Sequence, residues 1–98
     1  MQATLSEDLK LAGVEVDLES AERLRVEGLR LIEQAGQSLE VNLAGLKRAN
    51  SVTVALLLSW YRHAALHDKS ILFTGLSQEL RNIIEFSGLT QVLLPQTQ

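Results

Sequence analysis

An alternating segment followed by an apolar, helix-like segment is the feature that most constrains how this chain can fold. Leu39, Val41 and Leu43 are apolar and alternate with polar residues. This period of two is typical of a strand with one buried face. After a short connector come Asn50 and Ser51. Both are favourable helix N-caps, because a short side-chain oxygen can accept hydrogen bonds from the N–H groups of the first turn.

A largely apolar helix is predicted directly after these residues. Every residue from 52 to 58 is apolar except Thr53, and no charged residue occurs before Arg62. Such a helix is expected to be buried on nearly all sides, with its polar start at the surface. We therefore expect the functional site at Ser51.

An amphipathic helix is predicted over residues 17–35, with Asp17 as its N-cap and Gly36 ending it. Residues 9–16 alternate loosely and predict a strand, and residues 4–7 fit either a short edge strand or a frayed tail. Helical spacing predicts that the buried face of the helix holds Leu18, Ala21, Leu24, Gly28, Leu31, Ile32 and Ala35.

The last third of the chain predicts a further strand and helix. Residues 70–74 are apolar enough for a strand inside a sheet. Ser77 is expected to cap a third helix, and Gly88 to end it in the left-handed conformation. Residues 91–94 predict a last edge strand. The alternation of strands and helices indicates the α/β class with a mainly parallel sheet.

Composition limits the classes of function. The 98 residues fit a single domain, 1–98, with frayed ends at 1–8 and 95–98. The absence of cysteine excludes disulfides, thiolate metal sites and a cysteine nucleophile. A net charge of −3 argues against a nucleic-acid binder. The chain starts without a signal-peptide pattern, and its longest apolar run, 54–58, is too short to span a bilayer, so we expect a soluble cytoplasmic protein.

The central segment resembles the signature of STAS domains. That signature runs from a strand through a short turn to Asp-Ser or Asp-Thr, then Gly and an apolar helix. Ser51 falls on the family's regulatory Ser or Thr, whereas Asn50 stands where Asp is usual and Thr53 where Gly is usual. The resemblance extends from about Leu9 to about Leu94 and implies a small mixed sheet with helices packed mainly on one side. The residues that carry it are Val41-Asn42-Leu43, Leu46, Ala49-Asn50-Ser51 and Val54-Ala55-Leu56-Leu57-Leu58.

Within this family the chain resembles the MlaB type, the small cytoplasmic subunits of a phospholipid-transporting ABC system in Gram-negative bacteria. The resemblance implies a non-catalytic subunit that binds and supports the transporter ATPase. Through that ATPase it would act on the membrane permease and maintain outer-membrane lipid asymmetry. Such a subunit is cytoplasmic and peripheral to the inner membrane. The partner-binding residues that it implies are Ser51, Asn50, Thr53, Lys47, Arg48 and Val54.

Other interpretations of these residues remain open. From the sequence alone Ser51 is an ordinary N-cap, and Lys47 and Arg48 are either solvated charges or contacts for an acidic partner surface. The family also includes anti-sigma factor antagonists, which switch partners when the hydroxyl at this position is phosphorylated. Asn50 weakens that alternative, because an amide caps the helix but carries no charge.

Metal and catalytic sites are not expected. His63 and His67 have a spacing that can present two imidazoles to zinc, but no third ligand motif is evident. Histidines near a helix C-terminus are also favourable against the helix dipole. The chain has no paired carboxylates in a loop, no glycine-rich phosphate loop and no convincing Ser-His-Asp order, so we expect no cofactor and no enzyme activity. Trp60 and Tyr61 either anchor an interface or close the edge of the core.

Overall fold

The structure is a computed structural model of the whole chain, and it describes residues 2–4, 15–46 and 48–94. Most of the strand predicted over residues 9–16 lies outside the described residues, although Glu15 forms an isolated parallel bridge with Arg48. Of the segment 4–7, only Thr4 is described. The elements in chain order are β1 (Gln2–Thr4), α2 (Leu18–Gln34), β2 (Ser38–Asn42), α3 (Ser51–Leu66), β3 (Ser70–Thr74), α4 (Gln78–Phe86) and α5 (Thr90–Leu93).

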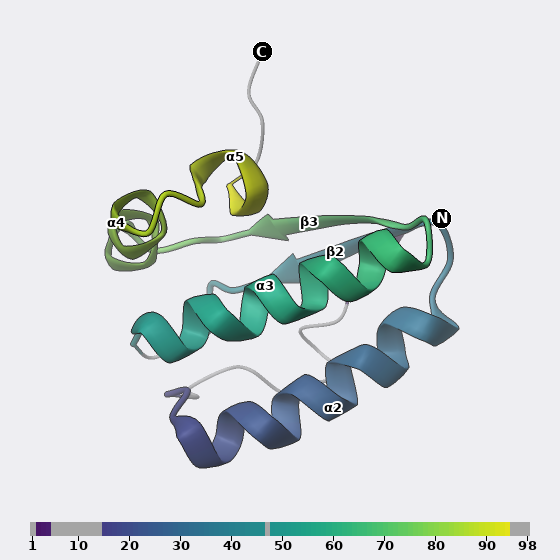
Figure 1. Cartoon of the computed structure of the whole chain (residues 1–98), viewed down its shortest axis with the longest axis horizontal. Helices are drawn as coiled ribbons and strands as arrows, with labels where there is room; N and C mark the ends of the chain where they lie inside the picture. The colour runs from purple at the N-terminus through teal and green to yellow at the C-terminus, as the bar shows by residue number, and fades with distance from the viewer. Residues whose placement is uncertain (1, 5–14, 47, 95–98) are drawn as a thin grey trace.

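The described strands form a parallel sheet in the order β1-β2-β3, so β2 is central and β3 lies at an edge. Figure 1 shows β2 beside β3. The predicted bounds of β3 are correct. Its apolar sequence predicts a strand inside a sheet, whereas β3 lies at the edge of the described strands. Leu39 pairs with Ile71, and Val41 pairs with Phe73. Leu39, Val41 and Phe73 are buried, whereas Ser38 and the other outward residues of β2 are exposed or half-buried. One face of the sheet is therefore covered by helices, which confirms the predicted class.

The two long helices, α2 and α3, lie side by side (Figure 1). They meet at Gly28 and Trp60. Trp60 is fully buried and donates its indole N–H to the carbonyl of Arg25 at 3.4 Å. A Cβ at position 28 would lie only 2.1 Å from the indole nitrogen, so only glycine leaves room for the ring. Trp60 thus belongs to the core and anchors no interface, and half-buried Tyr61 packs against the same core.

The boundaries of α2 agree with the sequence at its start and differ at its end. Asp17 is the N-cap, as predicted, but the helix ends at Gln34 with Ala35 as C-cap, and Gly36 has no positive φ. The ammonium group of Lys69 donates to the carbonyls of Ile32, Glu33 and Ala35, so a lysine satisfies the last carbonyls of the helix. Leu18, predicted to be buried, is 80% exposed.

The C-terminal elements confirm one prediction and contradict another. Ser77 caps α4, and Gly88 ends it with a φ of 76°. The predicted edge strand over residues 91–94 is wrong, because these residues form most of the short helix α5 and bury Leu93. None of the helices in the described ranges is long and apolar enough to cross a membrane.

Candidate partner-docking site

The start of α3 lies at the carboxyl end of the parallel strands, where open α/β sheets commonly bind their ligands (Figure 1). The side-chain oxygen of Asn50 accepts from the backbone N–H of Thr53 at 3.1 Å. In return, the hydroxyl of Thr53 accepts from the backbone N–H of Asn50 at 3.3 Å. Because Asn50 and Thr53 form this capping box, Ser51 is the first helical residue and not the cap.

Ser51 is exposed, and its hydroxyl makes no hydrogen bond to any residue in the described ranges. A hydroxyl that does not serve the cap is free to contact another molecule. The interpretation of Ser51 as an ordinary N-cap is therefore wrong, because the neighbouring amide fills that role.

Asn50 also holds the segment that precedes α2. Its side-chain N–H donates to the carbonyl of Val16 at 2.8 Å. A carboxylate could not make this bond, because an ionised Asp has only acceptors. Thr53, which is fully buried, completes the box from inside. The two departures from the STAS signature, Asn50 and Thr53, thus form one hydrogen-bonded unit.

The loop before Ser51 is fixed by a carboxylate from α4. Glu79 accepts from the backbone N–H of Ala49 at 3.0 Å and pairs with Arg48 at 3.5 Å. Nearby, Gly75 has a φ of 68°, and a Cβ there would lie 2.9 Å from the Cβ of Ala44. The loops after β2 and β3 therefore pack closely together and present Ser51 on a fixed frame.

The predicted partner-binding residues divide into three groups. Ser51 and Arg48 are exposed and Asn50 is half-buried, so these three lie where a partner can reach them. Thr53 and Val54 have exposed fractions of 0% and 5%, so the prediction that they contact a partner is corrected. Lys47 lies outside the described residues.

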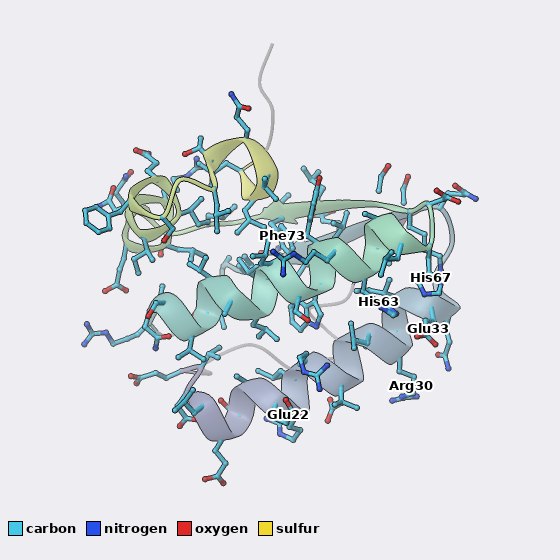
Figure 2. The ribbon with its side chains drawn as sticks, in the orientation of Figure 1. Glu22, Arg30, Glu33, His63, His67 and Phe73 are labelled. Atoms are coloured by element: carbon cyan, nitrogen blue, oxygen red, sulfur yellow. The ribbon has the colours of Figure 1, made fainter. Side chains whose placement is uncertain are left out.

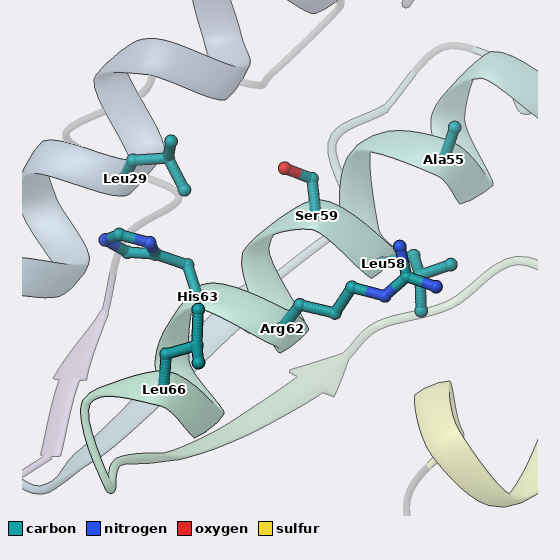
Figure 3. Close-up of a pocket in the computed structure, with 7 residues that line it drawn as sticks. All are labelled: Leu29, Ala55, Leu58, Ser59, Arg62, His63 and Leu66. Atoms are coloured by element: carbon teal, nitrogen blue, oxygen red, sulfur yellow. The ribbon is translucent and has the colours of Figure 1, made fainter.

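The sequence reasoning missed a groove along the exposed face of α3. The prediction of a helix buried on nearly all sides is wrong, because Ala55, Arg62 and Leu66 are exposed. Ser51 lies one turn before Ala55 and so shares this face. The groove has a volume of about 350 Å³ (Figure 3). Its lining residues are Leu29, Ala55, Leu58, Ser59, Arg62, His63 and Leu66.

A signal for this face exists in the sequence. Ser51, Ala55, Ser59 and Arg62 recur at spacings of four, four and three residues, and they are small or polar residues in a mostly apolar helix. Helical periodicity places such a set on one side. This pattern becomes visible only when small residues such as alanine are assigned to the outward face. Alanine is also common in protein cores, so its presence alone does not indicate exposure.

The opposite end of α3 carries a group of possible metal ligands. Glu33 of α2 approaches His63 and His67, and the ligand atoms of the three lie within 4.8 Å of one another. The reason for expecting no metal, the lack of a third ligand, therefore does not hold.

The comparison with protein families decides the assignment. The family model described as "Mlab, STAS domain" matches residues 2–95. The chain belongs to the MlaB-type STAS domain family. STAS proteins include both MlaB and anti-sigma factor antagonists; they act through protein–protein contacts and are generally non-catalytic regulators.

Two solved structures support the fold. The anti-sigma factor antagonist SpoIIAA in its unphosphorylated form matches with a TM-score of 0.69 and 24% identity, over 88% of this chain and 76% of that one. The Bacillus cell fate determinant SpoIIAA in its phosphorylated form matches with a TM-score of 0.64 and 24% identity, over 89% and 79%. At this identity the likeness shows the fold alone. The curated protein sequences contain no match.

Proposed function

We propose that this protein is a non-catalytic accessory subunit that docks onto the ATPase of a phospholipid-transporting ABC complex. Docking uses Ser51 and the exposed face of α3. Through the ATPase the subunit is held at the cytoplasmic side of the inner membrane and supports the permease indirectly. The larger process is the maintenance of outer-membrane lipid asymmetry.

The observation that carries this proposal is the exposed hydroxyl of Ser51, which bonds to no residue in the described ranges and lies one turn before Ala55, a residue that lines the groove. The capping box and the Asn50–Val16 hydrogen bond hold Ser51 in place without using its hydroxyl. A rigid, pre-formed surface binds with a smaller loss of conformational entropy than a mobile one.

The chemistry of the groove indicates what kind of partner surface fits it. Aliphatic side chains such as Leu58 and Leu66 offer apolar area, and Arg62 adds a positive charge (Figure 3). The complementary surface is a partner helix with apolar side chains and one carboxylate near Arg62. The MlaB-type family match supports an ABC-transporter ATPase as that partner.

A second candidate function is that of an anti-sigma factor antagonist, favoured by the structural likeness to SpoIIAA in unphosphorylated and phosphorylated forms. In this reading Ser51, which is exposed, is phosphorylated to change partners. Asn50 argues against it, because its amide donates to the Val16 carbonyl and carries no charge beside Ser51, where Asp is usual in the family signature.

Affinity capture of the tagged chain from its native host, with identification of bound proteins by mass spectrometry, separates the two functions. We expect the transporter ATPase to be captured, and Arg62→Glu to lower its yield at least about tenfold, since the change places like charges across the interface. Intact-mass analysis of the same sample is expected to show no phosphate on Ser51.

Arg30→Glu is the matched control, because Arg30 is an exposed arginine on the side of α2 away from α3 (Figure 2). It should leave the yield of ATPase unchanged. Capture of a sigma-factor regulator or kinase in place of the ATPase, with phosphate on Ser51, would establish the second function instead.

A further inference from the structure

We propose that Glu33, His63 and His67 form a binding site for a zinc ion that clamps the C-terminal ends of α2 and α3 together. The site lies at the opposite end of α3 from Ser51 (Figure 2). Ser51 and His63 are twelve residues apart, a separation of about 18 Å along the helix axis. His63 also lines the docking groove, but zinc binding is measured on the protein without a partner, so this proposal and the proposed function can fail separately.

The ligand atoms are already close to the arrangement that zinc requires. The Nε2 atom of His63 lies 2.8 Å from a carboxylate oxygen of Glu33, and all three ligand atoms lie within 4.8 Å of one another. Ligands at about 2.0–2.1 Å from a tetrahedral ion lie about 3.4 Å from one another. Glu33 and His67 are exposed, so their side chains can rotate to close this difference without movement of the helices.

The donor set also selects the class of metal. Two imidazoles and one carboxylate suit zinc and its neighbours among the transition metals, whereas magnesium and calcium prefer oxygen ligands alone. His67 is the C-cap of α3 and lies four residues after His63, so the two rings project from one face. The ring centroids lie 4.6 Å apart. Three protein ligands leave a fourth position for water.

The surroundings favour a cation at this place. α2 ends at Gln34 and α3 at Leu66, so the partially negative ends of two helix dipoles lie beside the site. The ammonium group of Lys69 contacts backbone carbonyls of α2 and leaves the carboxylate of Glu33 to His63. The side chain of His67 makes no hydrogen bond within the described residues, so its ring nitrogens are available to a metal.

Isothermal titration calorimetry of the full chain, with any affinity tag removed, tests the proposal directly. We expect one zinc ion per chain when zinc chloride is added to metal-free protein. Saturating zinc should also raise the melting temperature, because a ligand that binds only the folded state stabilises it. Cobalt should give the visible absorption of a tetrahedral site with nitrogen and oxygen ligands.

Single substitutions assign the ligands. Glu33→Gln, His63→Gln and His67→Gln should each weaken zinc binding at least about tenfold, since even supporting residues around metal sites have effects of this size. Glu85→Gln on α4 is the matched control and should bind as the wild type does, because Glu85 is an exposed glutamate outside the cluster. Melting curves without zinc show whether each variant is folded.

The chain contains two histidines and no cysteine, which makes a negative result decisive. Failure of the wild type to bind zinc or cobalt in the micromolar range would overturn the proposal. So would unchanged binding in a folded variant that carries both His63→Gln and His67→Gln, because the ion would then be held by other groups.

Discussion

The helices α2 and α3 start with the same device, a capping box, but the two boxes differ in burial and in charge. In α2 the cap is Asp17, an exposed carboxylate that accepts from the backbone N–H of Ser20 at 2.8 Å. In α3 the cap is Asn50, a half-buried neutral amide that also donates to the carbonyl of Val16. The first box makes local contacts, and the second joins segments 34 residues apart.

This difference shows how burial selects the capping residue. Water solvates the charge of the exposed Asp17, so the carboxylate interacts with the helix dipole at little desolvation penalty. At position 50 the side chain must both accept and donate, which an amide does at neutral pH and an ionised carboxylate does not. The start of α3 is therefore built to hold its neighbours in position, whereas the start of α2 stabilises only its own helix.

The largest stability effect is expected where the two helices meet. Gly28→Ala places a methyl group against the indole of Trp60, whose nitrogen would be 2.1 Å away. Overpacking of this kind costs about 1–3 kcal/mol, and a clash this close should reach the upper end. Chemical denaturation with urea measures the change in the free energy of unfolding.

Two further variants identify the cause of that effect. Gly28→Ala should cost less in a Trp60→Leu background, because the smaller side chain relieves the clash. Gly88→Ala strains a φ of 76° but meets no atom within 4 Å, so it should cost only about 1 kcal/mol. An equal cost for Gly28→Ala with and without Trp60 would show that the contact between the helices is not tight.

The next largest effect separates the two caps directly. Asn50→Asp removes the hydrogen bond to the Val16 carbonyl and sets a carboxylate oxygen against it. We expect a loss of about 1–3 kcal/mol at neutral pH, the cost of an unsatisfied, partly buried group. The folded protein should raise the pKa of the introduced carboxyl, since the protonated acid can donate to Val16. The loss should therefore shrink as the pH falls toward 4.

Asp17→Asn is the matched reverse substitution. Because the hydrogen bonds from Ser20 lower the pKa of Asp17 below 3.8, its contribution is fully present above that pH and declines as the pH falls further. The amide keeps the acceptor, so the variant should lose little at neutral pH and become less sensitive to acid than the wild type. Similar losses for both substitutions at neutral pH would contradict the distinction between the caps.

The sequence predicts those features of this fold that depend on local signals. The caps Asp17 and Ser77 and the left-handed Gly88 are found as predicted, and Asn50 is one of the two caps predicted for α3, because capping hydrogen bonds reach only a few residues along the chain. The bounds of β3 are also correct. In contrast, residues 91–94 were too few to distinguish a strand from a helix by their period alone.

The features that the sequence does not predict depend on contacts between distant segments. Glu33 lies 30 residues before His63, and only the packing of α2 against α3 brings them together. In the same way, the carbonyl of Val16 explains Asn50 only once both are placed in space. Leu18 is exposed although it continues the apolar spacing of α2, because it is the first residue of the helix and extends beyond the core.

The most direct test of the central claim, that Ser51 contacts a partner and does not maintain the fold, is a paired measurement on Ser51→Glu. A carboxylate in the first turn of a helix is favourable against the dipole, so we expect the melting temperature to stay within a few degrees of the wild type. The same group is unfavourable in a desolvated interface, so capture of the transporter ATPase should be lost. Thr90→Glu makes a similar change in the first turn of α5 and should leave capture intact. A folded Ser51→Glu variant that still captures the ATPase at the wild-type level would contradict the account and place the interface elsewhere.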